Sequence, residues 1–174
     1  MNLDDIVAID IHTHVHASVC GDPDPERFKA MHDYFRSDAV AANVHEMAAY
    51  YRQRHMIAVI FTVDSYTVSG NDPDPSNEEI AELSAEHPDA VIPFASVDPG
   101  RGKAGVKMLR RLVSEHGMRG LKLHPNTQEF FPNDRKVYPL YEVAQELRVP
   151  VLFHRGHTGV GAGVGGVAAM VSRP

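Results

Sequence analysis

The sequence of 174 residues contains one cysteine, no tryptophan and no long apolar run. Because Cys20 has no second cysteine to pair with, neither an internal disulfide nor a cysteine-based zinc site can form. No apolar run approaches the roughly 18 residues of a membrane-spanning helix. The first residues, Met-Asn-Leu-Asp-Asp, are acidic where a signal peptide is basic. These features predict a cytoplasmic protein with no membrane partner.

The sequence also has fewer basic than acidic residues. Lys and Arg number 17 against 23 Asp and Glu, so the formal net charge is −6. This balance excludes a nucleic-acid partner held by bulk positive charge. The hydrophobic fraction of 43%, with 13 glycines and 12 prolines, is ordinary for a globular protein. The length fits a single domain over residues 1–174.

What the sequence does contain is an alternation of short apolar segments with amphipathic ones. The apolar segments predict five strands, at residues 6–14, 56–63, 91–97, 120–124 and 150–154. The intervening patterns predict a helix from Ser37 to Tyr51, a second opened by a capping box at 76–79, and two more around 106–113 and 140–147. Strands that are apolar on both faces and alternate with helices predict an α/β fold with a parallel sheet.

Polar residues at the carboxyl ends of these strands favour a (β/α) barrel over an open doubly wound sheet. In barrels the active site is built at this end, where the sequence places Asp64 and Asp98 as well as several histidines. A doubly wound sheet is expected to carry a glycine-rich phosphate turn after its first strand, and this sequence has His-Thr-His-Val-His there. Residues 161–166 fit G-x-G-x-x-G, but no acidic residue follows at the required distance. Residues 155–174 are therefore interpreted as a glycine-rich loop or tail.

The sharpest motif is Asp10-x-His12-x-His14 on the first predicted strand. Two imidazoles at positions i and i+2 project from the same face of a strand, roughly 7 Å apart at the backbone. An ion with metal–nitrogen bonds of about 2.0–2.1 Å fits between such side chains. We therefore predict His12 and His14 as metal ligands, while Asp10 either ligates as well or orients an imidazole. Protons should compete with the ion near the ordinary histidine pKa of about 6.5.

Further candidates follow the later strands. His154 ends the fifth strand and is the expected third ligand, which would leave an open coordination position for water. Lys122 and His124 form another i, i+2 pair, which predicts either a substrate site with acid–base work by His124 or a rim lysine beside a loop-capping histidine. The candidate catalytic residues are thus His124 and Asp10, and the candidate substrate-binding residues are Lys122 and His157.

Three segments resemble the amidohydrolase superfamily: Ile9-Asp10-Ile11-His12-Thr13-His14, Gly120-Leu121-Lys122-Leu123-His124-Pro125 and Pro150-Val151-Leu152-Phe153-His154. The closer resemblance is to the branch that contains aminocarboxymuconate-semialdehyde decarboxylase. It implies a distorted (β/α)₈ barrel with one divalent metal, zinc first and manganese as the alternative, held by His12, His14 and His154. The family adds a histidine after the sixth strand and an aspartate after the eighth. A complete barrel takes around 250 residues, so these 174 are expected to supply about five βα units, with both later residues outside them.

The resemblance implies a metal-dependent hydrolase that acts on a small carbonyl or carboxylate substrate through a metal-activated water. One alternative is a metal-dependent, non-oxidative decarboxylase, a carbon–carbon lyase built on the same scaffold. Another is an inactive metal-binding fragment. The expected partners are a small-molecule substrate and further copies of the chain in a homo-oligomer.

Overall fold

Five apolar segments form parallel strands in the computed structural model, which describes residues 3–21, 29 and 42–155. The strands are β1 (Ala8–His14), β2 (Met56–Phe61), β3 (Val91–Pro93), β4 (Ala95–Ser96), β5 (Leu121–Leu123) and β6 (Val151–Phe153). All pairs are parallel, in the orders β1-β2-β3 and β4-β5-β6. The predicted α/β class and parallel pairing are confirmed.

The third predicted strand, residues 91–97, is not continuous but divides at Phe94 into β3 and β4. The backbone N–H of Phe94 still donates to Ile60 of β2, whereas that of Ala95 donates to Gly120, before β5. The segment therefore passes from one three-stranded sheet to the other and links them in chain order. Gly120 is required at this crossing, because the Phe94 ring lies within 2.5 Å of where a Cβ would stand.

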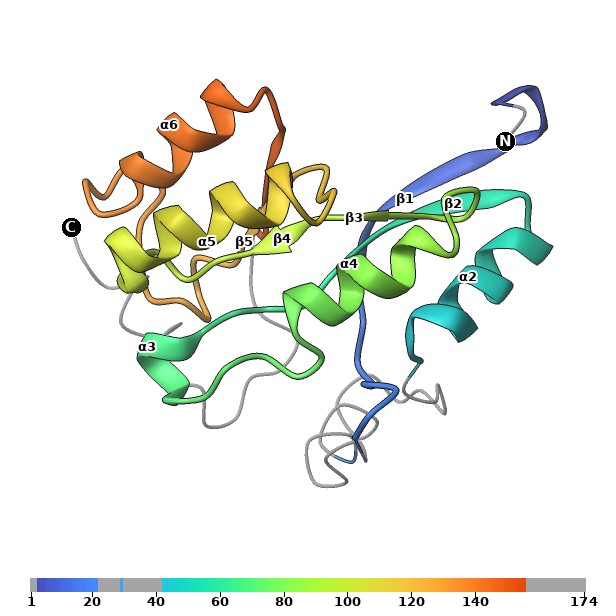
Figure 1. The fold of residues 1–174 in the computed structure, drawn as a ribbon, viewed down its shortest axis with the longest axis horizontal. Helices are drawn as coiled ribbons and strands as arrows, with labels where there is room; N and C mark the ends of the chain where they lie inside the picture. Colours follow the sequence, from blue (N-terminus) through green and yellow to red (C-terminus); the bar gives the residue numbers. More distant parts are fainter. Residues whose placement is uncertain (1–2, 22–28, 30–41, 156–174) are drawn as a thin grey trace.

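The helices cover a single face of the strands (Figure 1). The four longer ones are α2 (Val44–Gln53), α4 (Asn77–Ala85), α5 (Lys103–Ser114) and α6 (Tyr138–Glu146), with the short helices η1 (Leu3–Asp5), α3 (Tyr66–Ser69) and η2 (Pro99–Arg101) between elements. Side chains from all four longer helices pack with outward-facing strand residues in the main core. The opposite face holds a smaller cluster of strand residues around Phe61 and Phe94. Helices on one face and strands in chain order are the arrangement of a barrel wall rather than of a doubly wound sheet.

Two helix starts differ from the sequence prediction. Helix α2 begins at Val44, not near Ser37, because Asn43 and Glu46 form a reciprocal capping box there. Ser37 itself lies outside the described residues. At α4 only half of the predicted box forms: Ser76 accepts from the Glu79 backbone N–H, while the Glu79 carboxylate accepts from Ser18 and from the backbone of Val19.

The prediction that all strands are buried on both faces is wrong for β1. Val7, which precedes the strand, and the outward residues Ile9 and Ile11 are 73%, 52% and 58% exposed. Within the described part of the chain β1 pairs only with β2, and no helix covers its outer side. In strand β2, by contrast with the exposed β1, five of the six residues are buried.

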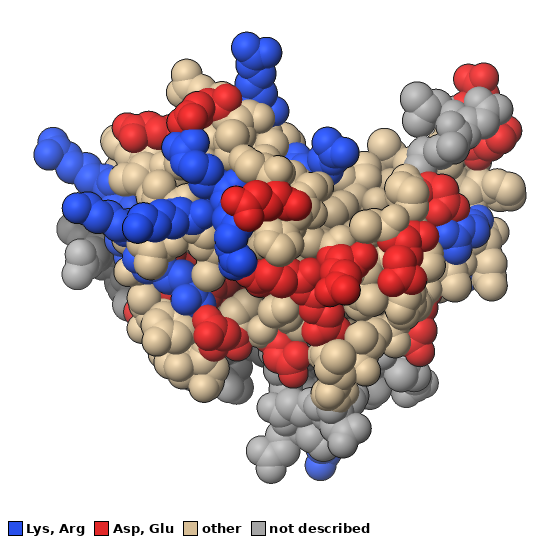
Figure 2. Space-filling view, viewed as in Figure 1, with Lys and Arg blue, Asp and Glu red and all other residues tan. Residues whose placement is uncertain are grey.

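Charges on the helical face separate by element. Figure 2 shows Lys and Arg gathered over α5 and acidic side chains over α4 and α2. Ion pairs connect α5 to its neighbours: Arg111 pairs with Glu78 of α4, and Arg110 pairs with Glu146 of α6. These side chains are largely exposed, so the pairs contribute little to stability. Within the described residues, no helix is long and apolar enough to cross a membrane.

Candidate active site

Four histidines and a lysine meet at the carboxyl ends of β1, β5 and β6. The His12 ring centroid lies 5.4 Å from that of His14 and 5.3 Å from that of His154. The His124 and His154 rings are stacked, with centroids 4.0 Å apart. The backbone N–H of His154 donates to Leu123, which sets β6 in register with β5 and fixes this stacking. The structure thus brings together His12, His14 and His154 with His124 and Lys122. His157, together with all of residues 156–174, lies outside the described residues.

Lys122 is completely buried in the middle of β5. Burial lowers the pKa of its amine to about 8, so the ammonium form still predominates at pH 7. Its Nζ donates to His12 Nε2 at 3.0 Å and lies 4.4 Å from the centroid of the Phe61 ring. The lone pair of His12 Nε2 is therefore directed at a cation in this structure.

The imidazoles that carry a resolved pKa shift are held neutral. Burial lowers the pKa of His14 to about 2 and, with smaller effects from His154 and Lys122, that of His124 to about 3. The pKa of His12 is lowered in the same way, by burial and then by Lys122. Neutral imidazole is the form that ligates metal ions. The neutral rings thus suit a divalent cation, and Lys122 competes for the lone pair of His12. His12, His14 and His154 do not form a preformed three-ligand cluster, because within the described residues only His45, Glu86 and His87 place ligand atoms within 4.8 Å of one another.

The proton on His124 can be placed from its neighbours. The backbone N–H of Thr127, which can only donate, lies 3.3 Å from His124 Nδ1, and the Thr127 hydroxyl lies 3.0 Å from the same atom. Nδ1 is therefore an acceptor, and in the neutral ring the proton is on Nε2. His124 is thus set to donate a hydrogen bond from Nε2.

Asp10 does not bond to an imidazole nitrogen of its own motif. Its Oδ2 accepts from the Tyr51 hydroxyl at 2.8 Å and its Oδ1 from the backbone N–H of His12 at 3.1 Å. These contacts hold the backbone of β1 against α2. In these contacts Asp10 anchors the backbone beside His12 and His14, a role different from the two left open by the sequence, metal ligation and orientation of an imidazole.

Three contributors were not predicted from the sequence. Phe61, the buried last residue of β2, packs edge-on against His12 and His14 and forms the floor of the site. Buried Gln128 accepts from the backbone of His124 and donates to the carbonyl of Asp64. Thr127 orients His124, as described above. In the sequence, Phe61 is marked only by its place at the end of an apolar strand, and Thr127 and Gln128 only by following Pro125.

Asp64 and Asp98 are buried at strand ends as predicted, but they hold loops together. Arg101 donates to both carboxylate oxygens of Asp64, at 2.7 and 2.9 Å. Asp98 accepts from the backbone and hydroxyl of Thr67 and from the backbone of Gly100. Neither carboxylate is free to face the histidines.

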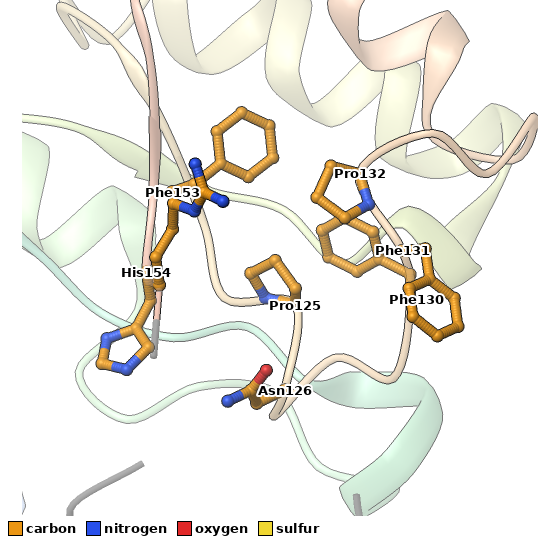
Figure 3. A pocket seen from close by; sticks show the side chains of 8 residues that line it. Pro125, Asn126, Phe130, Phe131, Pro132, Phe153 and His154 are labelled. Atoms are coloured by element: carbon orange, nitrogen blue, oxygen red, sulfur yellow. The ribbon is translucent and has the colours of Figure 1, made fainter. Parts of the chain in front are cut away.

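A pocket of about 490 Å³ opens beside His154 (Figure 3). It is lined by Pro125, Asn126, Phe130, Phe131, Pro132, Phe153, His154 and Arg155. The volume lies in the range typical of small-molecule sites. Its aromatic and proline walls suit an apolar or planar group, with polar side chains only at Asn126, His154 and Arg155.

Comparison with known proteins identifies the fold and the family. No curated protein sequence matches the chain significantly. Among solved structures, the chain resembles 4-oxalomesaconate hydratase from Rhodopseudomonas palustris (23% identity, TM-score 0.54, 84% of this chain and 51% of that one). It also resembles 2,6-dihydroxybenzoate decarboxylase from Rhizobium (15% identity, TM-score 0.58, 90% of this chain and 52% of that one). Another match is dihydroxybenzoic acid decarboxylase from a Polaromonas species, solved with bound manganese (18% identity, TM-score 0.55, 86% of this chain and 49% of that one).

The chain spans about half the length of these structures. The sequence model of the amidohydrolase family matches residues 9–171, which include every candidate site residue described above. The chain therefore belongs to the amidohydrolase family.

Proposed function

We propose that the protein containing this chain is a metal-dependent hydrolase acting on a small carbonyl or carboxylate substrate. The observation that carries the proposal is the convergence of His12, His14 and His154 on the end of the strands that also presents Lys122 and His124. In amidohydrolases a divalent ion at such a site polarises a carbonyl and lowers the pKa of water. Zinc is the expected ion, and manganese, present in two matched structures, is the alternative.

The chain's own residues would bind and orient the substrate. Within the part of the chain that the structure describes, the Lys122 ammonium contacts His12 and the Phe61 ring but no carboxylate, so it can pair with a substrate carboxylate or an anionic oxygen. His124 would donate from Nε2 to the same group, because Thr127 holds its Nδ1 as an acceptor. The pocket beside His154 would take the apolar part of the substrate and exclude water from it.

A decarboxylase is the second candidate. Lys122 is suited to hold a carboxylate, and two of the matched structures described above are decarboxylases of aromatic acids. The two reactions separate in one experiment on the whole protein, in which aromatic acids, amides and lactones are incubated in ¹⁸O-labelled water. A hydrolase incorporates the label into its organic product, whereas a decarboxylase releases carbon dioxide and leaves its organic product unlabelled.

The metal assignment is tested by the metal content of the purified protein. We expect the His12→Ala/His14→Ala variant to lose the ion and the surface variant His55→Asn to retain it. Asn is a suitable control because it tolerates the positive φ of 52° at this position. Equal metal content in all three proteins would contradict the assignment.

The single exposed thiol, Cys20, fits the reducing cytoplasm that we propose as the location.

A further inference from the structure

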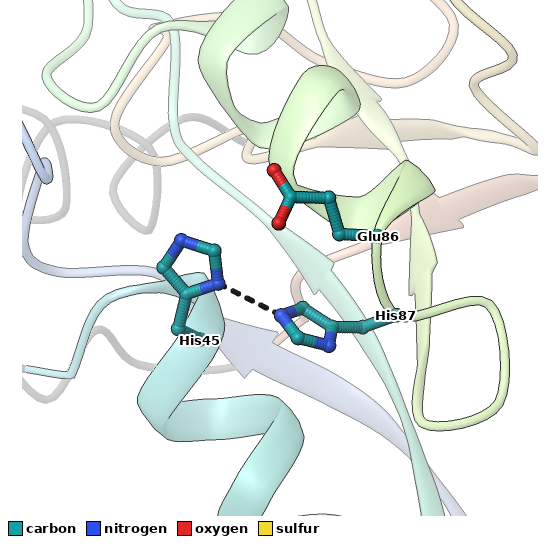
Figure 4. A group of neighbouring side chains, drawn as sticks. All are labelled: His45, Glu86 and His87. Atoms are coloured by element: carbon teal, nitrogen blue, oxygen red, sulfur yellow. Dashed lines mark hydrogen bonds between the residues drawn. The ribbon is translucent and has the colours of Figure 1, made fainter.

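We propose that His45, Glu86 and His87 form a second, surface site for a divalent transition-metal ion. His45 lies in the first turn of α2, and Glu86 and His87 follow the last turn of α4. One ligand atom from each residue lies within 4.8 Å of the other two. Figure 4 shows the Glu86 carboxylate beside the point where the two imidazoles meet. The site is separate from the candidate active site, because none of its residues belongs to the cluster around His12.

The distance between the two imidazoles suits an ion of particular geometry. His45 Nδ1 and His87 Nε2 are 2.8 Å apart. With metal–nitrogen bonds of about 2.0–2.1 Å, an ion that contacts both atoms has an N–metal–N angle of roughly a right angle. Such angles occur in octahedral and tetragonal complexes, which Ni²⁺ and Cu²⁺ favour. Tetrahedral Zn²⁺ would require the two nitrogens to separate by roughly half an ångström.

The hydrogen bonds show that the ion would take the place of a proton. The Arg52 guanidinium, which only donates, is 3.4 Å from His87 Nδ1. His87 therefore carries its proton on Nε2 and donates it to His45 Nδ1. An ion bound between the two rings replaces this shared proton. Arg52 is itself held by two hydrogen bonds to Asp89, at 2.6 and 2.7 Å.

The surrounding charge also favours a cation. Acidic residues gather over α2 and α4 (Figure 2), and those of these two helices and their caps are Glu46, Glu78, Glu79, Glu82 and Glu86. Asp89 follows two residues after His87 and pairs with Arg52 at 2.6 Å, so this cation adds no net positive charge beside the site. The field over these helices attracts divalent ions rather than repelling them.

An ion at this site would connect two elements that are distant in sequence. It links the start of α2 to the turn between α4 and β3, and these elements contact each other in the fold. Because the three ligands come together only in the folded chain, binding stabilises the fold by mass action. The unfolding temperature should therefore rise with the concentration of the ion.

The test is a Ni²⁺ titration of the metal-free protein, followed by equilibrium dialysis and by thermal unfolding. It is carried out in the His12→Ala/His14→Ala background so that the candidate active site does not contribute. We expect one Ni²⁺ to bind and raise the unfolding temperature. Adding His45→Ala/His87→Ala should abolish both effects, and Glu86→Gln should weaken binding by about tenfold or more.

Matched controls are Glu82→Gln on the same helix and His55→Asn on a nearby turn, which should bind Ni²⁺ as the background does. Circular dichroism of the metal-free variants establishes that each is folded. Should the background variant not fold, the same titration in the otherwise unaltered protein should show one Ni²⁺ fewer after His45→Ala/His87→Ala. Equal stoichiometry and equal stabilisation with and without His45 and His87 would overturn the proposal. That result would leave the active-site proposal untouched, because His12 and His14 are tested separately.

Discussion

At the scale of single residues, the contact between Lys122 and His12 determines how the candidate active site can accept a cation. The Lys122 ammonium already occupies the lone pair of His12 Nε2 at 3.0 Å. A metal ion held by His12 must therefore displace the ammonium of Lys122, which is buried. The same ammonium is the group best placed to bind an anionic substrate, so ion binding and substrate binding depend on one side chain.

This contact predicts opposite effects of Lys122→Met on the two kinds of binding. Removing the ammonium eliminates a like-charge repulsion within a few ångström of the ion, so the affinity for Mn²⁺ or Zn²⁺ should rise roughly tenfold. Turnover of a carboxylate substrate should fall in the same variant. Isothermal titration with metal and steady-state kinetics measure the two effects, and Lys107→Met on the exposed side of α5 is the control. Weaker metal binding in Lys122→Met would show that the lysine supports the ion instead of competing with it.

The pKa values also correct the expected pH dependence of metal binding. The sequence alone predicts proton competition near pH 6.5, but burial lowers the pKa of His14 to about 2 and that of His12 in the same direction. A lowered pKa means that the neutral, ligating form of these two rings persists below pH 6.5, so affinity should begin to fall at a lower pH than the ordinary histidine pKa predicts. Lys122 loses its charge near pH 8, so affinity should rise through that range. Metal titrations across these pH values should show the rise in the unaltered protein but not in Lys122→Met; a steep loss at pH 6.5 would contradict the burial of these rings.

The sequence predicted which residues meet at the site but not what holds them there. Alternation along a strand placed His12 with His14 and Lys122 with His124, because side-chain direction follows directly from residue spacing. The roles of Phe61, Gln128 and Thr127 depend on contacts between segments that are distant in the chain or on the local path of a loop. No periodicity encodes such contacts.

At the scale of elements, the loops after β2 and β4 are joined through buried Asp64. Its carboxylate accepts from Arg101 and from the backbone N–H groups of Tyr66 and Asp98. Gln128 connects the Asp64 carbonyl to the backbone of His124. A chain of hydrogen bonds thus runs from the ion pair to the candidate active site.

We predict that Arg101→Met destabilises the protein by about 3–5 kcal/mol, because it leaves the Asp64 carboxylate buried without its counter-charge. Adding Asp64→Asn should recover part of this loss. Arg110→Met is the matched control: its partner Glu146 is 60% exposed, so the expected loss is much smaller than that of Arg101→Met. Urea unfolding gives the free energy of unfolding of the unaltered protein, of the two single variants and of the Arg101→Met/Asp64→Asn variant. Equal losses in the Arg101 and Arg110 variants would show that the buried pair contributes no more than an exposed one.

The errors in predicting elements share one physical cause. Helix α2 was expected from Ser37, since amphipathic spacing continues through that region, but the capping box at Asn43 and Glu46 sets its actual start. Residues 91–97 form an apolar run that predicts a single strand, yet the run crosses between two sheets at Phe94. In both cases the apolar pattern identified the element correctly, while local hydrogen bonds determined its bounds.

At the scale of the whole molecule, β1 is the strand whose burial the sequence predicted least well. Its alternation placed Val7, Ile9 and Ile11 on one face, and they do share a face, but that face is open. Whether a strand face is buried depends on which element packs against it, and a strand's own sequence does not specify that element. The part of this chain that matches covers only 51% and 52% of two of the matched structures.

The polypeptide of residues 1–174 should therefore associate with itself through β1. A pairing edge next to three exposed apolar side chains favours contact with a second copy, because contact removes apolar surface from water and satisfies free backbone groups. Replacing Val7, Ile9 and Ile11 with Thr keeps the strand propensity of β-branched residues and removes much of the apolar surface. Sedimentation velocity over a range of concentrations should show the unaltered polypeptide associating and this variant shifted towards monomer. The control, Val19→Thr/Val68→Thr, changes valines that are 45% and 44% exposed elsewhere on the surface and should associate like the unaltered polypeptide. A polypeptide that is monomeric at all concentrations, or a β1 variant that associates as strongly as the control, would show that the outer face of β1 does not drive association.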